Sequence, residues 1–169
     1  LSKKYKLSTI INNLELYSPK INKLFNILNS TDIYGKHVVY TSFIGVGINV
    51  IEKALINSGW ISIFKIYKDP EKWQRYENKV YAIWSGNESN IKKNIIKQVA
   101  NDKNNIYGNK IKLIIGSPSI KEGISFKHIQ NIHLLDPVWN IAGKKQIEGR
   151  AIRFCSHYDI NEKIHKNLK

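Results

Sequence analysis

Residues 110–117 read KIKLIIGS, a short run rich in apolar side chains that ends in glycine and serine. Such a run is typical of a strand buried on both faces, because a strand with one solvated face alternates apolar and polar side chains. Comparable runs occupy residues 36–43, 61–67, 79–86 and 131–137. The sequence therefore predicts five strands in a sheet that is covered on both sides.

Segments with helical periodicity separate these runs. Apolar residues recur at the spacing of one helix face in residues 18–31, 47–60 and 88–102, and residues 69–77 carry a proline early in a short helix or loop. A last helix at residues 146–153 follows the last strand. Alternating strands and helices predict an α/β fold with a mainly parallel sheet, in which ligands gather at the carboxyl ends of the strands.

Length and composition fit one domain. The chain has 169 residues, and 42% of them are hydrophobic, which is enough for a core. We expect a polar lead over residues 1–17 and one domain over residues 18–169. No apolar run approaches the roughly 18 residues of a membrane span, and the amino terminus lacks the apolar stretch of a signal peptide. With a single Cys155, these features predict an intracellular protein without membrane contacts.

The formal net charge of +14 predicts a polyanionic partner, and nucleic acid is the first choice. Clustered lysine and arginine residues release counterions from a phosphate backbone, which favours binding. An alternative stays open, because lysine, asparagine and isoleucine are abundant along the whole chain and the excess lysines can simply cover solvated faces. The charge supports a nucleic-acid partner without establishing one.

The predicted last helix, QIEGRAIR, has a distinctive face. Spacing of i, i+3, i+4 and i+7 places four residues together on it: Gln146, Gly149, Arg150 and Arg153. A neighbouring apolar stripe at the same spacing is able to dock the helix on a core: Ile147, Ala151 and Phe154. Two guanidinium groups on a fixed support suit a multi-oxygen anion such as a phosphate. The alternative is a solvated basic face.

Three phrases, taken in order, resemble a known family. GSPSIKEGISF at residues 116–126, LLDPVWN at 134–140 and QIEGRAIR at 146–153 resemble motifs V, Va and VI of the second RecA-like lobe of superfamily-two helicases and translocases. VVYTSF at 38–43 resembles motif IV of the same lobe. The resemblance covers roughly residues 18–155 and is strongest to the group of large cytoplasmic DNA viruses, similar to the poxvirus nucleoside triphosphatase I and the small subunit of the early transcription factor.

The resemblance implies an ATP site between two lobes. The second lobe of this family supplies motif VI arginines, so Arg153 would be the arginine finger on the γ-phosphate and Arg150 a second phosphate contact. Such a cation stabilises the charge that develops during phosphoryl transfer. By the same resemblance, the residues that bind ATP or couple its site to the nucleic acid would be Gln146, Gly149, Asp136, Trp139, Asn140, Gly123 and Glu122. Trp139 could equally be a core aromatic residue.

The resemblance also implies a nucleic-acid site. Thr41 and Ser42 of motif IV, with Ser117, Ser119 and Lys121 of motif V, would hold the backbone through donors that ignore base identity. For Ser117 and Ser119 a second interpretation stays open, because serine hydroxyls often satisfy backbone groups at a turn. The implied partner is nucleic acid, DNA in the first place.

The sequence lacks the motifs that the first lobe of such an ATPase supplies. No G-x-x-x-x-G-K-[ST] occurs, and no Asp-Glu pair follows a strand, so the phosphate loop and the metal-holding acids are absent. We therefore expect an excised or trimmed piece that is inactive alone and that binds no metal itself. ATP and Mg²⁺ would belong to the full-length protein, with an amino-terminal RecA-like lobe and transcription machinery as partners, in host cytoplasm or virion.

Three other features of the sequence suggest different functions. A noncatalytic basic module that keeps the lobe fold would bind nucleic acid without ATP coupling, but it would not need the motif VI set. Gly45 and Gly47 mimic the start of a dinucleotide fingerprint, whose third glycine is replaced by Val50. Cys155 and His157 do not make a structural zinc site, because zinc needs four ligands and the chain has no second cysteine.

Overall fold

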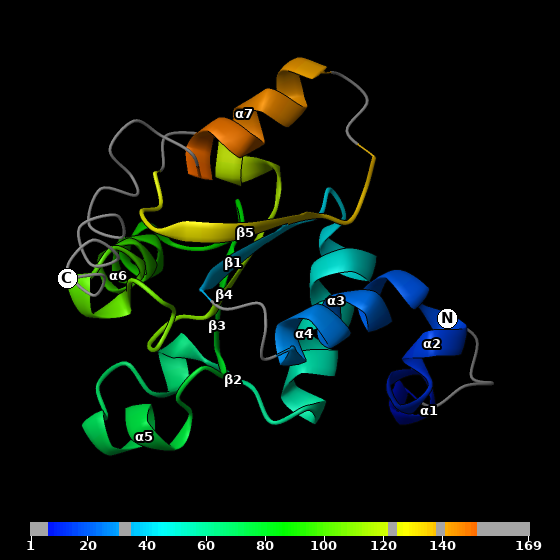
Figure 1. Cartoon of the computed structure of the whole chain (residues 1–169), viewed down its shortest axis with the longest axis horizontal. Helices are drawn as coiled ribbons and strands as arrows, with labels where there is room; N and C mark the ends of the chain where they lie inside the picture. Colours follow the sequence, from blue (N-terminus) through cyan, green and yellow to red (C-terminus); the bar gives the residue numbers. More distant parts are fainter. Residues whose placement is uncertain (1–6, 31–34, 122–124, 138–140, 152–169) are drawn as a thin grey trace, which may run out of the picture.

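The structure is a computed structural model that describes residues 7–30, 35–121, 125–137 and 141–151, and it contains a five-stranded sheet (Figure 1). Every neighbouring pair of strands is parallel, in the order β2-β3-β4-β1-β5. The strands are β1 Lys36–Tyr40, β2 Ile61–Ser62, β3 Val80–Trp84, β4 Leu113–Gly116 and β5 Ile129–Leu134. The parallel α/β sheet predicted from the sequence is confirmed.

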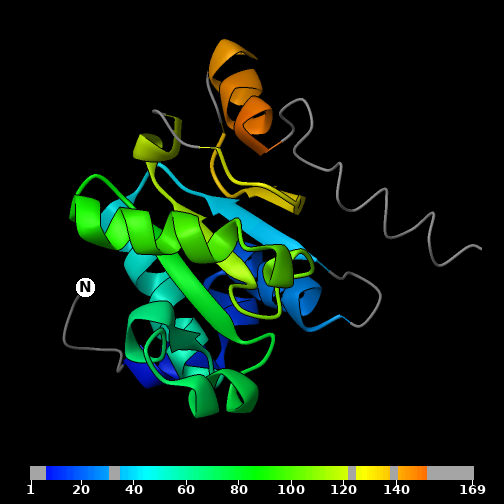
Figure 2. The same ribbon diagram turned by 90° about the vertical axis from the view of Figure 1, so that its left-hand side faces the viewer.

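Helices cover both faces of this sheet. α6 lies against one face, and α3 and α4 lie against the other (Figure 2). The α-helices in the described ranges are α1 Leu7–Asn12, α2 Leu14–Tyr17, α3 Pro19–Asn29, α4 Asn49–Asn57, α5 Pro70–Arg75, α6 Asn90–Ala100 and α7 Ile141–Ala151. The short turns are the π-helical η1 Ile44–Ile48 and the 3-10 helices η2 Ile63–Lys65, η3 Lys103–Asn105 and η4 Pro118–Lys121. In these ranges no helix has the length and apolarity that a membrane crossing requires.

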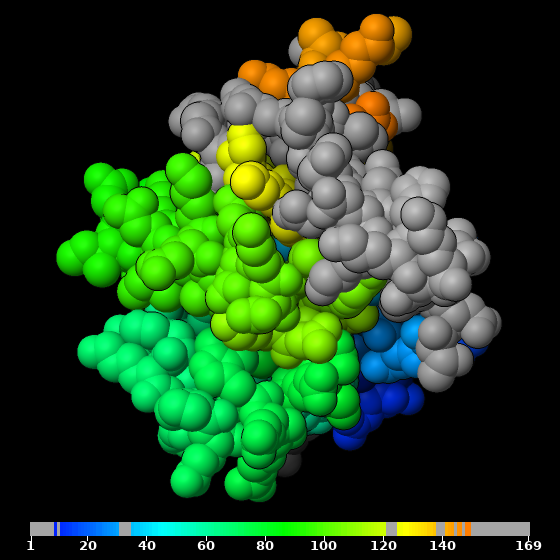
Figure 3. Space-filling model, turned by 60° about the vertical axis from the view of Figure 1, so that its left-hand side comes forward, coloured from blue at the N-terminus to red at the C-terminus, as the bar shows by residue number. Residues whose placement is uncertain are grey.

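Side-chain alternation along β1 divides the core into two layers. Val38 and Tyr40 pack in the layer that contains Ile96 of α6, whereas Val39 packs in the layer that contains Ile51 of α4. All five side chains are buried. Because successive strand residues point to opposite faces, one run of apolar residues supplies both layers. Figure 3 shows the outside of the first layer, where the side chains of α6 lie next to the segment that includes α5.

Local chemistry fixes where several helices begin. Pro19 and Pro70 are the first residues of α3 and α5, a position where the missing N–H of proline costs no hydrogen bond. The side chains of Asp69 and Ser89 each accept a hydrogen bond from a backbone N–H in the first turn that follows. The helices predicted within residues 18–31 and 88–102 are confirmed, and residues 69–77, predicted as a short helix or loop, contain α5.

One predicted strand is wrong in length. Residues 61–67 were expected to be a strand, but only Ile61 and Ser62 pair with β3, and the chain then turns into η2. Ile63 and Ile66 are both fully buried in the same core layer. Residues three apart share a side of a helical turn but point to opposite faces of a strand, so burial of both favours the turn.

The described part of the predicted polar lead, residues 7–17, is mostly helical. It contains α1 and α2, and Ile11 and Leu14 pack against the core layer formed by α3 and α4. The amphipathic signal of so short a segment is weak in sequence, since isolated helices of this length are marginal and depend on tertiary packing. The domain boundary at residue 18 stays a prediction.

Lys36, the first residue of β1, is fully buried. Its Nζ donates hydrogen bonds of 2.6 Å to the backbone oxygens of Ala100, the last residue of α6, and of Lys127. Within the described ranges it makes no salt bridge. Burial lowers the pKa of Lys36 from 10.5 to about 7, because desolvation penalises the ammonium form. This side chain ties the start of β1 to the end of α6.

Replacing Lys36 should change how stability depends on pH. The folded pKa of about 7 lies below the unfolded value of 10.5, so the unfolded chain binds more protons between these two pH values. The free energy of unfolding should therefore rise with pH across that window, by about 1.4 kcal/mol per pH unit. In Lys36→Met this rise should be lost, as measured by urea unfolding at both ends of the window. Lys53→Met, which removes an exposed lysine of α4, is the control; equal pH profiles for the two variants would contradict the assignment.

Candidate functional site

The carboxyl ends of the strands carry a row of polar residues. Thr41 follows β1, Ser85 follows β3, Ser117 follows β4 and Asp136 lies two residues after β5. Because all the strands are parallel, these residues meet at one edge of the sheet. Helix α7 lies beyond this edge, near η4 and β5 (Figure 1). The sequence-predicted motif positions that the structure describes are therefore gathered in one region.

Asp136 joins the ends of β1 and β5. Its Oδ2 accepts a hydrogen bond of 2.7 Å from the Thr41 hydroxyl and one of 2.8 Å from the Ser42 backbone N–H. The Thr41 oxygen in turn accepts from the N–H of Phe43 at 3.3 Å. Hydrogen bonds to an ionised acceptor are stronger than neutral ones. One carboxylate oxygen thus links a predicted coupling residue to both predicted nucleic-acid residues of motif IV.

Ser117 forms the corresponding turn after β4. Its side chain is buried, and its Oγ lies 3.1 Å from the Oγ of Ser119. Its backbone N–H donates to the oxygen of Trp84, and its oxygen accepts from the N–H of Ile120. The Ser117 hydroxyl therefore contacts another hydroxyl of the same turn, and both backbone bonds are made by the main chain of Ser117. Thr41 and Ser117 are each only 1% exposed, so their hydroxyls do not reach the surface in this conformation, whereas Ser42 is exposed.

Gly47 in η1 permits the close packing of this turn on Thr41. A Cβ added at Gly47 would lie 2.5 Å from Thr41 Oγ1 and 3.1 Å from Thr41 Cγ2. Gly45, in the same turn, has no atom within 4 Å of an added Cβ. The two glycines that mimic a dinucleotide fingerprint therefore differ, and only Gly47 is required by the packing around the site.

Alanine substitutions at the two glycines should separate these roles. Gly47→Ala should destabilise the protein by about 1–3 kcal/mol, because the new methyl overpacks the Thr41 side chain. Gly45→Ala should be neutral or stabilising by up to about 1 kcal/mol, since alanine has the higher helix propensity. Urea unfolding of both variants measures the difference, and equal effects would show that the contact with Thr41 does not limit residue 47.

A double-mutant cycle should reveal the Thr41–Asp136 bond. Thr41→Val and Asp136→Ala should each lower the free energy of unfolding by about 1.5–3 kcal/mol, because each removes a hydrogen bond to a charged group. Both changes together should cost less than their sum, since they break the same bond. Ser42→Ala is the matched control: the hydroxyl of Ser42 bonds Tyr40 at 3.3 Å and not Asp136, so no coupling to Asp136→Ala is expected. Strict additivity in both cycles would contradict the network.

Part of the predicted motif VI face lies on α7, within the residues that the structure describes. Gln146, Gly149 and Arg150 lie on α7 at i, i+3 and i+4 spacing, with Gln146 and Gly149 exposed. A Cβ added at Gly149 meets no atom within 4 Å, so contacts of the described chain do not explain a glycine there. Predicted residues outside the described ranges are Glu122, Gly123, Trp139, Asn140 and Arg153, and nothing is described of the side chains of Lys121 and Arg150.

The described residues offer no metal centre. Nowhere in those ranges do three or more histidine, cysteine, aspartate or glutamate residues come together in a way that could hold an ion. Sequence reasoning missed two residues at the edge: Tyr40, whose hydroxyl bonds Ser42, and Gly47. For Gly47 the signal was present, because a glycine that follows a strand end by a few residues often marks a close backbone approach.

The architecture and this edge define a class of protein. A parallel sheet covered by helices on both faces, with polar strand ends beside a carboxyl-edge helix, is the architecture of a RecA-like helicase lobe. The crystal structure of the C-terminal part of the Fun30 ATPase domain has this fold: it superposes with a TM-score of 0.63 at 17% identity, over 85% of this chain and 39% of that chain. A likeness at this identity concerns the fold alone.

Sequence comparison identifies the family. The model of the helicase conserved C-terminal domain matches residues 19–155, so the chain belongs to this family. A protein of Acanthamoeba polyphaga mimivirus named as an ATP-dependent RNA helicase is 38% identical over 149 residues, which is 85% of this chain and 24% of that protein. The viral helicase and nucleoside triphosphatase group expected from the sequence is confirmed.

Two further relatives belong to large DNA viruses. Nucleoside triphosphatase I of Melanoplus sanguinipes entomopoxvirus is 47% identical over 62 residues, 37% of this chain and 10% of that protein. The termination factor NPH-I homolog of African swine fever virus is 25% identical over 167 residues, 83% of this chain and 23% of that protein. The chain spans about a quarter or less of each of these relatives.

Proposed function

We propose that this chain acts as the carboxy-terminal lobe of an ATPase that moves along DNA during viral transcription. The observation that carries the proposal is the Asp136 network, in which one carboxylate holds Thr41 and Ser42 at the edge beside α7. An ATP-driven motor must transmit change between a nucleotide site and a nucleic-acid site. A charged hydrogen bond between two strand ends is a physical link of that kind.

The ATP side of the proposal rests on α7. Gln146, Gly149 and Arg150 share one face of this helix, and Arg153 belongs to the same face by spacing. An exposed glycine without a packing reason suits the close approach of another surface, here the nucleotide or the amino-terminal lobe. We assign Arg153 to the γ-phosphate and Arg150 to a second phosphate contact, where guanidinium groups stabilise developing negative charge. Glu122, Gly123, Trp139 and Asn140 remain proposed coupling residues.

The nucleic-acid side of the proposal rests on the other strand ends. We propose that exposed Ser42 and partly exposed Ser119 contact a phosphate backbone directly, together with Lys121 at the end of η4. Buried Thr41 and Ser117 would instead support these turns from beneath. Contacts of hydroxyl, amide and lysine donors to phosphate carry no base preference, which suits a protein that translocates.

We propose that another lobe supplies the metal. Mg²⁺ neutralises phosphate charge in such ATPases and is held by carboxylates, but the described residues form no acidic cluster that fits it. The sequence also contains no phosphate loop. We therefore propose that an amino-terminal RecA-like lobe of the same polypeptide supplies both, and that this chain alone does not hydrolyse ATP.

ATP hydrolysis by the full-length protein tests the proposal. With single-stranded or duplex DNA present, Arg153→Ala should lower hydrolysis by roughly 10³ to 10⁵, the effect of losing an arginine finger. Arg75→Ala, which removes an exposed arginine of α5 far along the chain from motif VI, should leave the rate unchanged. Normal hydrolysis by Arg153→Ala would refute the ATP role of this arginine and leave the lobe as a nucleic-acid-binding module of the ATPase.

Parallel assays with RNA decide the nucleic-acid partner. One relative is named as an RNA helicase, whereas the names of the nucleoside triphosphatase I and the termination factor homolog specify no nucleic acid. Stronger stimulation of hydrolysis by DNA supports the proposed substrate. Stimulation by RNA alone would keep the motor assignment but overturn the choice of DNA.

A further inference from the structure

The motif V segment, residues 117–126, is held at both of its described ends by the last residue of β3. At the first end, the backbone N–H of Ser117 donates a hydrogen bond of 3.0 Å to the oxygen of Trp84. At the second end, Phe126 is buried and packs edge-on against the Trp84 ring, with centroids 5.5 Å apart and an angle of 88° between the rings. Both ends of the segment therefore depend on the same residue.

A side chain at the end of α6 fixes the second end from outside the motif. Asn101, which follows the last residue of α6, donates from Nδ2 to the backbone oxygen of Ser125 at 3.1 Å. Its Oδ1 accepts from the backbone N–H of Lys127 at 2.7 Å. An amide side chain can donate and accept at once, and here the two bonds lie on either side of Phe126 along the chain. We call this pair of bonds the Asn101 clamp.

The backbone that follows the clamp is also fixed. Nζ of Lys36 donates a hydrogen bond of 2.6 Å to the oxygen of Lys127. The next residue, His128, is buried and has a φ of 59°, in the left-handed region. A residue with a Cβ is strained there and keeps this conformation only where surrounding contacts impose it, which is common at functional sites. The bonds from Asn101 and Lys36 to Lys127 are contacts of this kind.

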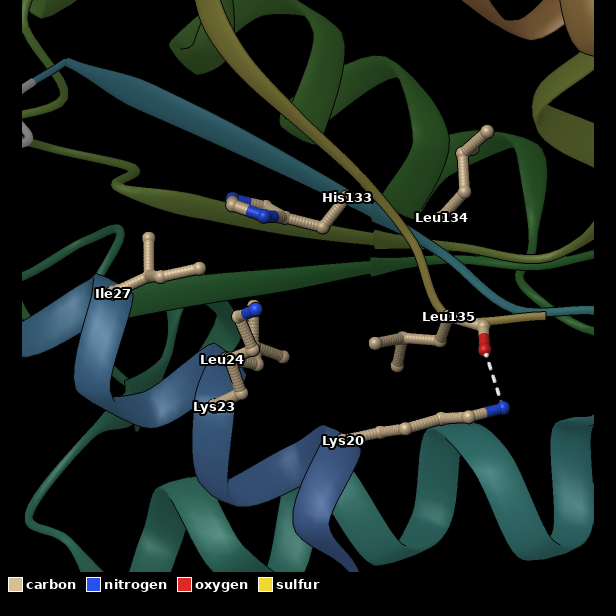
Figure 4. A pocket seen from close by; sticks show the side chains of 7 residues that line it. All are labelled: Lys20, Lys23, Leu24, Ile27, His133, Leu134 and Leu135. Atoms are coloured by element: carbon tan, nitrogen blue, oxygen red, sulfur yellow. Dashed lines mark hydrogen bonds between the residues drawn. The ribbon is translucent and has the colours of Figure 1, made fainter.

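Another helix side chain holds backbone at the carboxyl edge less firmly. Lys20 of α3 donates a hydrogen bond of 3.1 Å to the backbone oxygen of Leu135, the residue before Asp136 (Figure 4). Lys20 is exposed, and fixing a long exposed side chain costs much of its rotamer freedom. Asn101 is half-buried, has a short side chain and makes two bonds to one segment. Its loss should therefore release the backbone more than the loss of Lys20.

We propose that Asn101 is a positioning residue for the nucleic-acid site, because the Asn101 clamp keeps the motif V segment ordered for contact with a phosphate backbone. The inference rests on the proposed function, in which Ser119 and Lys121 of this segment make that contact. Asn101 would act through Ser125 and Phe126 and not by a contact of its own. A segment that is already ordered loses less chain entropy on binding, so the clamp raises the affinity.

Binding of nucleic acid to the full-length protein tests this inference. Asn101→Ala removes both bonds of the clamp and should weaken the binding of a labelled single-stranded DNA roughly tenfold, as followed by fluorescence anisotropy without ATP. A matched RNA is measured in parallel. Asn101→Asp keeps the acceptor for Lys127 but loses the donor to Ser125, so it should weaken binding too. Wild-type affinity in both folded variants would overturn the inference.

Asn105→Ala is the matched control for a purely structural effect. Asn105 is buried, and its Oδ1 accepts from the backbone N–H groups of Lys110 and Ile111, in the connection that leads into β4. By urea unfolding, this change should cost at least as much stability as Asn101→Ala, because it leaves buried backbone groups without a partner. It does not touch the clamp and should leave the affinity for nucleic acid unchanged. Equal weakening by the two alanine variants would show that lost stability lowers the affinity, and would overturn the positioning role.

ATP hydrolysis separates a failure of this inference from a failure of the proposed function. In Asn101→Ala, the nucleic-acid concentration that gives half-maximal stimulation should rise roughly tenfold, whereas the KM for ATP should change far less. Stimulation of Asn101→Ala at the wild-type concentration would overturn the positioning role alone. Wild type that binds nucleic acid without stimulated hydrolysis would overturn the proposed motor, while weaker binding by Asn101→Ala would still support the clamp. Wild type that binds neither DNA nor RNA would overturn both.

Discussion

The requirement to cover both faces of a parallel sheet shapes this molecule. Each strand must be apolar on both sides, as Val38 and Val39 on β1 show, so functional polar groups cannot lie in the middle of a strand without cost. They are confined to the ends, where the chain leaves the sheet. The position of the candidate site follows from this constraint, since parallel strands bring all their carboxyl ends to one edge.

The Asp136 network joins two strand ends at that edge. β1 and β5 are adjacent in the sheet, but their carboxyl-end loops are far apart in sequence and lead to different motifs. One carboxylate that accepts from Thr41 and from the Ser42 N–H keeps the two loops in a fixed relation. These two bonds restrain the segment that follows β5 against the turn that contains Ser42. Burial of the Thr41 hydroxyl strengthens this link, because water competes less for it.

The sequence predicts local features well and long-range contacts poorly. Apolar runs located all five strands, and helical spacing located α3, α4 and α6, because these signals lie within a few neighbouring residues. The strand at 61–67 failed because burial of Ile63 and Ile66 on one side depends on the surrounding core. The hydrogen bonds of Lys36 could not be predicted for a similar reason, because the two acceptors lie 64 and 91 residues away in the sequence. The order of the motifs correctly predicted that the site residues lie at the carboxyl ends of the strands. No pattern within a motif reveals that Asp136 binds Thr41.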